Sequence, residues 1–505
     1  MRIVRLHLRT LARVLWVFPL AIITIPGKAT AGSASISPSW SDVIRTSPTT
    51  PTLQVVVNPM LRPESPISHR AFQALHRLGA NDVRFVPWLP YPQLAVAELK
   101  PPGNGKTFWN FKLIDPMVQN FMRATSGHPV IMNFSTIPEW LYRTAKPVDW
   151  PANPNQVFWS YEGGTHLRKG GLKKVADYYA RLVSWYTRGG LRDEYGHWHR
   201  SGYHYHFAWW EVLNEVDFEH HMNVQTYTRM YDAITAAIHK VSPQTRFVGL
   251  ALAAPSNDLA WFKYFLNPRN HAPGTPLNMI SYHFYATPTP KDKPASWPHI
   301  FFSQAKGFLN TVRKIQAIRR KLSPQTQTDI DEIGSILPFD TAPKLVRPIP
   351  NMYWNLSGAM YAYLFAHLAR QGIQIAGESQ LIGYPSQFPS VSMVNWNTGV
   401  PNARFRVLEL LHDNFGPGDR IIATNDHTPG IFAQAFITPA GVRKILLINK
   451  RNDVIPVNIP KVRGAIEHWV DQRTAERPPA RRKLAHNRLK LRGLAVAVIT
   501  LKKAQ

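Results

Sequence analysis

The sequence predicts an α/β protein, a (β/α)8 TIM barrel followed by a C-terminal antiparallel β-sandwich module. The chain has 505 residues, which is enough for a large barrel and a smaller second unit. Through most of the chain, short β-branched or apolar runs alternate with longer helical patterns, as in parallel βα units. From about Arg420 the apolar runs are closely spaced and no helical pattern separates them, which indicates antiparallel strands.

Eight strand candidates separated by helical patterns predict that the barrel is closed. The strands are expected at residues 53–57, 82–86, 130–134, 207–213, 246–250, 279–283, 328–332 and 373–377. The helical patterns between them include residues 69–78, 172–186, 226–241, 302–321 and 357–370. We therefore expect the barrel domain to span residues 53–415.

Residues 416–505 are predicted to form the β-sandwich module. Its strands are expected in apolar runs at residues 431–437, 442–448, 454–459, 465–470 and 494–501. A basic stretch at residues 477–492 includes Arg481, Arg482 and Lys483. This stretch is interpreted either as a solvated loop or as a patch that binds a cell envelope or another polyanion.

Residues 1–31 are typical of a secretory signal peptide. Four arginines precede an apolar run at residues 14–25, and a small-residue cleavage sequence, Ala-Thr-Ala, ends at Ala31. A signal anchor is the alternative, but the apolar run is short for a membrane span and contains Pro19. We expect a secreted or periplasmic protein without a stable membrane span, in which residues 32–52 lead into the barrel.

The chain is strongly basic, with a formal net charge of +28 at pH 7. Removing residues 1–31 takes away five cations and no acid, which leaves +23. Such a charge favours anionic partners, and an anionic polysaccharide or a negatively charged envelope suits a secreted protein. No nucleic-acid-binding module is recognisable, so no nucleic-acid partner is expected. The absence of cysteine excludes disulfides, thiolate nucleophiles and cysteine-based metal sites.

Two of the predicted strands end on glutamate. The fourth closes on Asn214 and Glu215, and the seventh closes on Glu332. The reactive groups of a TIM barrel lie at the C-terminal ends of its strands, and strands four and seven face each other across the barrel mouth. Glycoside hydrolysis needs two carboxyl groups, one to protonate the leaving oxygen and one to attack the anomeric carbon or activate water. Either glutamate alone could be a helix cap or a surface acid, but together they predict a glycosidase acting on a carbohydrate substrate.

These two segments resemble those of retaining TIM-barrel glycosidases, and most of all glycoside hydrolase family 39, which includes β-xylosidases and α-L-iduronidases. The run EVLNE at residues 211–215 is similar to that family's Glu-x-Trp-Asn-Glu-Pro motif, and DEIG at residues 331–334 is similar to its nucleophile segment. The resemblance implies that Glu215 is the acid/base, that Glu332 is the nucleophile, and that Asn214 binds the sugar 2-hydroxyl.

The likeness to family 39 covers roughly residues 53–415, and it extends to residues beyond the two motifs. The chain departs from the family at Leu213 and Val216, where Trp and Pro are usual. The segment SYHFY at residues 281–285 is similar to a strand-six end that places a histidine and an aromatic residue near the nucleophile. By that resemblance, His283 and Tyr285 are site residues.

Several further residues are candidates for substrate binding. Arg84 is placed similarly to an arginine of the retaining TIM-barrel glycosidases that steadies the nucleophile. An ion pair inside the barrel would explain an arginine at this position equally well. Trp88, Trp140 and Trp396 could stack on sugar rings, and a core position is the alternative for each. Glu378 follows the eighth strand and could reach the rim of the site, or act as a cap or surface acid.

The mechanism depends on the distance between the two carboxyl groups. A separation of about 5–5.5 Å implies retention through a glycosyl-enzyme, and about 6.5–9.5 Å implies inversion. As general acid, Glu215 is expected to have a raised pKa, while Glu332 stays ionised with the help of Arg84 and Tyr285.

Other functions remain open. The pairs His197/His199 and His204/His206 could each share one face of a strand, so a metal site is an alternative. No His-Glu-x-x-His motif occurs, and we expect neither a metal nor another cofactor. A catalytically silent carbohydrate- or envelope-binding protein is a second alternative, and a transglycosidase that uses the same two glutamates is a third.

Overall fold

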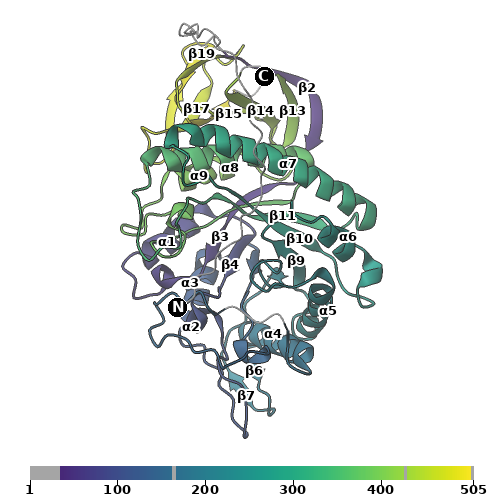
Figure 1. Ribbon diagram of the computed structural model, residues 1–505. Helices are drawn as coiled ribbons and strands as arrows, with labels where there is room; N and C mark the ends of the chain where they lie inside the picture. Colours follow the sequence, from purple (N-terminus) through teal and green to yellow (C-terminus); the bar gives the residue numbers. More distant parts are fainter. Residues whose placement is uncertain (1–33, 162–165, 426–428, 502–505) are drawn as a thin grey trace, which may run out of the picture. The chain divides into compact units, whose positions relative to one another are not determined.

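The structure is a computed structural model that describes residues 34–161, 166–425 and 429–501 (Figure 1). The predicted signal peptide lies outside the described residues. Ser33–Gln505 forms one compact unit. Within the described ranges, no helix combines the length and the apolar character that crossing a membrane requires.

Eight parallel strands close into a barrel, as predicted. In order they are β3 (Thr50–Val56), β4 (Val83–Val86), β5 (Val130–Met132), β8 (Trp209–Glu211), β9 (Arg246–Leu252), β10 (Met279–Ala286), β11 (Gln327–Ser335) and β12 (Ile375–Glu378). Because β12 pairs with β3, the barrel has no open edge. Each strand overlaps its predicted position. Several are buried along their whole length, which explains why the sequence shows them as short apolar runs.

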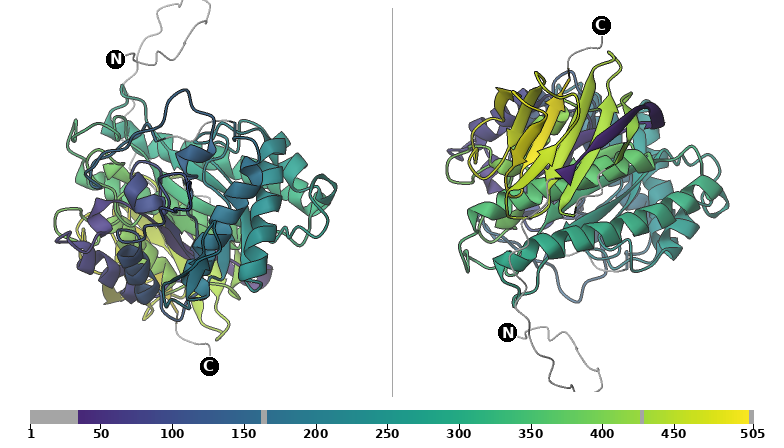
Figure 2. Two further views of the ribbon diagram at one scale, coloured as in Figure 1. Left: turned by 90° about the horizontal axis from the view of Figure 1, so that it is seen from below. Right: turned by 90° about the horizontal axis from the view of Figure 1, so that it is seen from above.

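Helices follow the strands and surround the barrel (Figure 2). They are α1 (Ser68–Leu78), α2 (Pro92–Ala95), α3 (Asp115–Ala124), α4 (Gly171–Thr187), α5 (Val224–Val241), α6 (Ala260–Phe265), α7 (Trp297–Leu322), α8 (Asn351–Gln371) and α9 (Ala403–His412). Single 3-10 turns lie at Pro59–Leu61, Glu139–Leu141, Pro268–Asn270, Pro294–Ser296 and Pro389–Val391. The ends of the helices have local causes. The Asn223 side chain caps α5 by accepting from the backbone N–H of Thr226, and α8 stops at Gly372, which has a φ of 77°.

The C-terminal module consists of two sheets. The larger sheet has the order β18-β17-β20-β15-β14-β13-β2, and the smaller has the order β1-β16-β19. The bounds are β1 (Ala34–Ser35), β2 (Ser37–Thr46), β13 (Arg420–Asn425), β14 (Ile431–Ile437), β15 (Arg443–Asn449), β16 (Ile455–Asn458), β17 (Ile466–Val470), β18 (Ala480–Lys483), β19 (Arg488–Leu491) and β20 (Val496–Thr500). The pairings are antiparallel except for β1 with β16.

The segment that the sequence predicts as a lead-in contributes two strands to this module. β2 pairs with β13 at the edge of the larger sheet, where Figure 2 shows it beside the C-terminal strands. Its sequence, SPSWSDVIRT, is polar and mostly exposed, so it lacks the apolar alternation by which a strand is recognised. Polar sequences are common in edge strands because they discourage pairing with other chains.

β14, an inner strand of the larger sheet, is buried on both faces. Phe432 and Phe436 of β14 belong to the same core as the barrel helices, whereas Ala433 and Ala435 belong to the core of the module. The ring of Phe432 lies 5.2 Å from that of Tyr363 on α8. Successive side chains of a strand point to opposite faces, so one strand serves both cores. This arrangement explains the continuous apolar runs of the C-terminal sequence.

The basic stretch at residues 477–492 forms β18 and β19, together with the turn that joins them. Half of this stretch is therefore strand and not loop, although most of its residues are exposed, as the interpretation as a solvated loop expects. Sequence patterns missed β18 because it consists of Ala-Arg-Arg-Lys and is largely exposed.

Candidate active site

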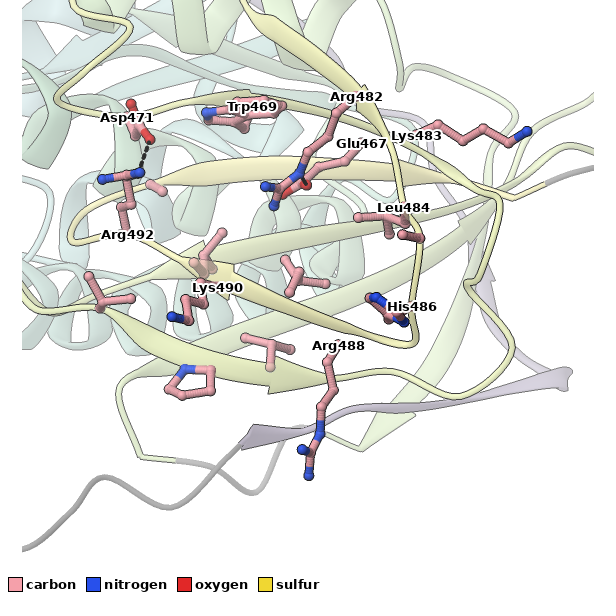
Figure 3. A pocket seen from close by; sticks show the side chains of 17 residues that line it. Glu467, Trp469, Asp471, Arg482, Lys483, Leu484, His486, Arg488, Lys490 and Arg492 are labelled. Carbon is pink, nitrogen blue, oxygen red and sulfur yellow. Dashed lines mark hydrogen bonds and ion pairs between the residues drawn. The ribbon is translucent and has the colours of Figure 1, made fainter.

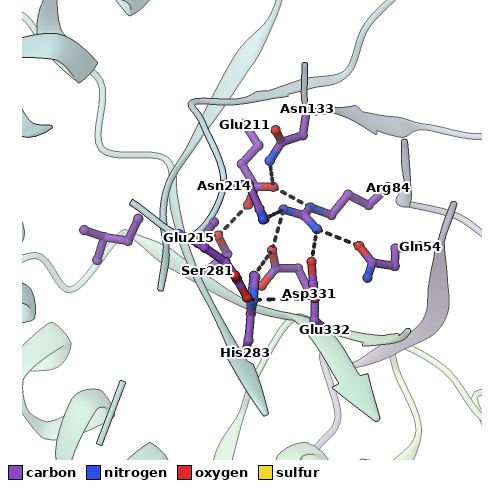
Figure 4. Close-up of polar contacts among 12 residues, drawn as sticks. Gln54, Arg84, Asn133, Glu211, Asn214, Glu215, Ser281, His283, Asp331 and Glu332 are labelled. Carbon is purple, nitrogen blue, oxygen red and sulfur yellow. Dashed lines mark hydrogen bonds and ion pairs between the residues drawn. The ribbon is translucent and has the colours of Figure 1, made fainter. Parts of the chain in front are cut away.

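Arg84 is the centre of a polar network inside the barrel mouth (Figure 4). It is buried on β4 and donates hydrogen bonds to side chains from three other strands or their ends. These bonds reach Glu211 Oε2 at 2.5 Å, Glu332 Oε1 at 2.7 Å, Asn214 Oδ1 at 2.6 Å and Gln54 Oε1 at 2.6 Å. Arg84 therefore contacts the candidate nucleophile Glu332 and also forms an ion pair with Glu211 inside the barrel.

Glu332 lies on β11 and is 7% exposed. Its two carboxylate oxygens accept hydrogen bonds from different donors, Arg84 Nη1 at 2.7 Å and the Tyr285 hydroxyl at 2.5 Å. The Tyr285 hydroxyl also lies 2.5 Å from Ser379 Oγ. A donor on each oxygen fixes the orientation of the Glu332 carboxylate.

Glu215 occupies the turn that follows β8. Its φ of 43° is unusual for a residue other than glycine, and its backbone N–H donates to the carbonyl of Ala251 at 2.9 Å. The carboxyl oxygen Oε1 lies 3.0 Å from His283 Nδ1. Burial raises the pKa of Glu215, and although His283 lowers this pKa, it remains above its ordinary value.

His283 lies between the two candidate catalytic carboxyl groups. Its Nδ1 is 3.0 Å from Glu215 Oε1 and 3.5 Å from Glu332 Oε2, and its Nε2 is 3.3 Å from Asp331 Oδ2. Burial alone would lower the pKa of His283, but the charges of Glu332 and Asp331 raise it well above its ordinary value. The two carboxylates therefore favour the charged form of His283.

Glu215, His283 and Glu332 each offer an oxygen or nitrogen within 4.8 Å of the others. This spacing could suit a metal ion, but the guanidinium of Arg84 binds Glu332, and the positive charge of Arg84 disfavours a second cation there. The distances instead place two carboxyl groups close enough to act on the same atom of a ligand.

The histidines considered as metal ligands lie elsewhere. His197 and His199 belong to the hairpin of β6 (Gly190–Arg192) and β7 (Trp198–Arg200), and both contact Asp193 Oδ2, at 3.3 and 2.8 Å. Among the described residues, no group of three ligands with metal spacing includes any of these histidines. The contacts of His197 and His199 with Asp193 show a role within the hairpin.

A cavity of about 420 Å³ opens above the two glutamates. Glu215, Glu332, Asn214, Tyr285 and Trp88 all line it, so five of the residues expected from the sequence lie together. His283 contacts Glu215 and Glu332, and Arg84 contacts Glu332 and Asn214.

The cavity wall is rich in aromatic residues that the sequence did not predict. The ring of Trp88 lies 5.3 Å from that of Trp159 and 6.0 Å from that of Phe388. Phe218, which also lines the cavity, is 66% exposed. Trp159 and Phe388 lie in long loops, where sequence spacing gives no direction to a side chain. Phe218 follows Glu215 by three residues, and this proximity could have identified it.

Glu219 is a third carboxyl group in the cavity wall, and it was also missed. Its Oε1 accepts hydrogen bonds from Trp88 Nε1 at 2.5 Å and from Asn214 Nδ2 at 2.9 Å. Its Oε2 is buried without a hydrogen-bond partner in the described part of the chain. Burial raises the pKa of Glu219 well above its ordinary value, and the charge of Glu215 raises it further.

Three other candidates lie away from the cavity. Trp140 packs against the core and donates its indole N–H to the carbonyl of Glu98 at 2.9 Å, and Trp396 also packs against the core. Glu378 is fully buried and forms an ion pair with Arg404 of α9 at 3.0 Å. The prediction that Glu378 reaches the rim is wrong, because α9 supplies a cation that holds this carboxylate inside the protein.

No protein-family model matches the chain, and no curated protein sequence matches it significantly. Solved structures do share its fold. A family GH51 arabinofuranosidase from Xanthomonas axonopodis pv. citri aligns with a TM-score of 0.62 at 11% identity, covering 93% of this chain and 100% of that chain. For an α-L-arabinofuranosidase from Thermotoga maritima, the TM-score is 0.60 at 13% identity, with the same coverage of both chains, 93% and 100%.

A GH30 endoxylanase from Clostridium papyrosolvens C71 is similar as well, with a TM-score of 0.55, 11% identity, and coverage of 93% of this chain and 100% of that chain. At such low identity, the likeness establishes the fold alone. The resemblance to family 39 is not confirmed by these comparisons.

Proposed function

We propose that the protein is a retaining glycoside hydrolase of oligo- or polysaccharides, with Glu215 as acid/base and Glu332 as nucleophile. The observation that carries this proposal is the pair of carboxyl groups of Glu215, in the turn after β8, and Glu332, on β11. One oxygen of each lies within 4.8 Å of an oxygen of the other, and both residues line one cavity. Retaining enzymes hold these groups about 5–5.5 Å apart, whereas inverting enzymes leave about 6.5–9.5 Å for a water molecule. The short spacing supports retention, and the arabinofuranosidase and xylanase names of the fold neighbours support the glycosidase class.

In the first step, a Glu332 oxygen attacks the anomeric carbon and the bond to the glycosidic oxygen breaks. The proton of Glu215 passes to that oxygen, and the leaving group departs as an alcohol. The raised pKa of Glu215 keeps this proton in place before the reaction. Arg84 and Tyr285 hold Glu332 in position, so little reorganisation precedes the attack.

In the second step, Glu215 is ionised and removes a proton from water. The oxygen of that water attacks the anomeric carbon, and the ester bond to Glu332 breaks. The charge of His283, 3.0 Å from Glu215, stabilises the Glu215 carboxylate between the two steps. His283 thus supports the change of Glu215 from acid to base.

The remaining residues of the cavity bind and orient the sugar in this proposal. Asn214 is fixed by Arg84 and lines the cavity beside Glu215, which suits a partner of the sugar 2-hydroxyl. Trp88, Trp159 and Phe218 offer aromatic faces for the apolar faces of sugar rings. The sequence patterns agree with a family 39-like enzyme that is secreted or periplasmic. Residues 1–31 would be its export signal.

The proposal is tested with a purified chain that begins at Gly32 and a panel of aryl xylosides, arabinofuranosides, glucosides and uronides. We expect release of the phenol from at least one of them. Glu215→Gln and Glu332→Gln should each lower kcat by roughly 10²- to 10⁴-fold while substrate still binds. Glu64→Gln, at the exposed surface, is the matched control and should leave kcat unchanged.

Unchanged turnover in either active-site variant would contradict the assignment of that glutamate as a catalytic residue. Binding of glycans without turnover of any glycoside would favour a carbohydrate-binding protein instead. A transglycosidase would release sugar-transfer products where the hydrolase releases free sugar. Treatment with EDTA should leave the full activity, and its loss would favour the metal-dependent alternative.

A further inference from the structure

Two cavities lie outside the proposed active site, and they differ in what they offer a ligand. One, of about 1140 Å³, lies in the C-terminal module (Figure 3). Two arginines of its lining are paired with acids, because Arg482 lies 2.5 Å from Glu467 and Arg492 lies 3.4 Å from Asp471. The charges of these arginines are therefore balanced within the module. The other cavity lies beside the barrel cavity and is described next.

This smaller pocket, of about 150 Å³, shares its wall with the barrel cavity, and we call it the side pocket. Residues 336–342 and residues 386–391 each contribute to the lining of both cavities. Four of them line the barrel cavity, namely Ile336, Thr341, Phe388 and Val391. The side pocket is lined by residues that lie between these along the chain, among them Phe339 and Pro389. The two segments therefore form a wall with one cavity on each side.

Hydrogen bonds hold the two segments of the wall together. Phe388 donates its backbone N–H to the carbonyl of Asp340 at 3.0 Å, and Leu337 donates its backbone N–H to Ser390 Oγ at 2.9 Å. The buried Asp340 carboxylate accepts from both the backbone N–H and the hydroxyl of Ser390. The two sides of the wall are therefore fixed relative to each other.

Phe339 has an exposed ring and a strained backbone. The residue is 55% exposed and packs into none of the hydrophobic cores that the described residues form. Its φ of 72° lies in the left-handed region, which costs free energy for a bulky residue. Phe388, on the other side of the wall, has a φ of 50°. Such strain is concentrated at ligand-binding sites, where the surrounding structure maintains it.

The segment that carries Phe339 has further exposed apolar side chains. Leu345 and Val346 are both exposed, and both line the side pocket. Residues 336–350 connect β11 to α8, and connections of this length usually bind a ligand or cover a site. The loops that follow the strands of a TIM barrel form its active-site face. An exposed apolar surface on such a loop therefore indicates a binding surface.

Hydrogen-bonding groups line the side pocket beside the apolar ones. Asp292 Oδ2 accepts from the backbone N–H and the hydroxyl of Thr289, both at 2.7 Å. Lys344 and Arg347 also line the pocket, and both are exposed. A sugar ring offers an apolar face to a phenyl ring and hydroxyl groups to polar side chains. This combination of side chains therefore suits a sugar.

A second copy of the chain is a less suitable occupant, although exposed apolar residues also occur at protein interfaces. A protein docked on the side pocket would cover Asp292, Lys344 and Arg347, and burying a charge without a partner is costly. The wall that the side pocket shares with the barrel cavity favours a ligand that occupies both.

We propose that the side pocket is a second sugar subsite, in which Phe339 stacks on a sugar of the same chain that Glu215 and Glu332 cleave. Phe339 and Thr341 are exposed, so a sugar chain can cross the wall at these residues. This inference rests on the proposed function, and it narrows the substrate to chains of several sugars.

The proposal is tested by titrating oligosaccharides into the chain from Gly32 that carries Glu215→Gln. The probes are xylohexaose, arabinohexaose, cellohexaose and hexagalacturonate, and calorimetry compares each with its disaccharide. We expect at least one hexasaccharide to bind about tenfold more tightly than its disaccharide. Adding Phe339→Ala should lower this ratio to less than about twofold, whereas Phe339→Trp should maintain it because an aromatic face remains.

Phe108→Ala is the matched control, because Phe108 is 41% exposed on another loop and lines neither the barrel cavity nor the side pocket. It should leave the ratio unchanged. The proposal would be overturned if no probe bound, if hexasaccharides bound no more tightly than disaccharides, or if Phe339→Ala left the ratio as it was.

Light scattering tests the second copy as the occupant. A dimer that dissociates in the Phe339→Ala variant would overturn the sugar subsite. Failure of the proposed function has a different signature. The ratios would then be as expected, but the chain with Glu215 intact would turn over no aryl glycoside.

Discussion

Arg84 explains why one glutamate of the EVLNE run is not a catalytic candidate. Glu211 lies beneath the site, fully buried, and its carboxylate accepts from Arg84, Asn133 and Ser281. It therefore balances the charge of Arg84, while Glu215 and Glu332 face the cavity. The sequence alone does not separate Glu211 from Glu215 and Glu332; the cavity does, because only the latter two line it.

The charge of His283 sets the pH dependence that we expect. It lowers the pKa of Glu215, which burial raises, so His283→Gln should raise that pKa further. Because Glu215 acts as an acid only when it is protonated, activity is lost as pH rises through this pKa. The alkaline limb of kcat/KM should therefore move to higher pH.

This shift is measured from the pH profile with an aryl glycoside that the enzyme cleaves. His76→Gln on the exposed side of α1 is the control and should leave the profile in place. An alkaline limb that stays in place or moves to lower pH in the His283 variant would contradict the assignment of Glu215.

Glu219 is expected to act as an uncharged carboxylic acid, because burial raises its pKa well above the ordinary value. Glu219→Gln keeps an oxygen to accept from Trp88 and Asn214, so kcat/KM should fall less than about tenfold. Glu219→Ala leaves both donors without that acceptor, at a cost of about 1–3 kcal/mol, and should lower kcat/KM further. Steady-state kinetics compare the two variants, and an equal loss in both would indicate an ionised Glu219 with a direct role.

Among the helices and strands, those with a regular apolar pattern could be predicted and the polar ones could not. All eight barrel strands were found, most of them because they are short buried apolar runs, although β11 has the sequence QTDIDEIGS and is largely polar. β2, β7 and β18 were missed because their residues are largely polar or exposed. The side chains of Trp140, Trp159 and Trp396 are oriented by the segments that connect the barrel strands and helices. The spacing of apolar residues in the sequence does not predict how such a segment folds against the barrel.

The ion pair between Glu378 of β12 and Arg404 of α9 provides a test of the packing around the eighth strand. Both side chains are fully buried, so Arg404→Met leaves a carboxylate without its partner. We expect a loss of about 3–5 kcal/mol in the free energy of unfolding. The double variant Arg404→Met/Glu378→Leu should recover much of this loss. Urea denaturation measures both, and an equal loss in the single and double variants would show that the unpaired carboxylate is not the cause.

The barrel and the module depend on each other, because α8 and β14 share a core and the first strands of the chain complete the module. A chain that begins at Ser47 lacks β1 and β2. It loses Ile36 from the module core and exposes the edge of β13. We expect its free energy of unfolding to fall by at least roughly 2 kcal/mol and its tendency to aggregate to rise.

The control for this truncation is a chain that begins at Ser33, which keeps both strands. Urea denaturation and light scattering compare the two chains. Equal stability and equal monodispersity would show that β1 and β2 are dispensable, which would contradict the arrangement of the two sheets.

The most direct test concerns the glycosyl-enzyme. Glu215→Ala should still react with a dinitrophenyl glycoside, whose leaving group needs no proton, but it lacks the base that activates water. The intermediate should therefore accumulate, so that intact mass spectrometry shows the protein heavier by one glycosyl residue. Peptide sequencing should place the added sugar on Glu332. Release of dinitrophenol without any adduct, or an adduct on another residue such as Glu219, would contradict the proposed mechanism.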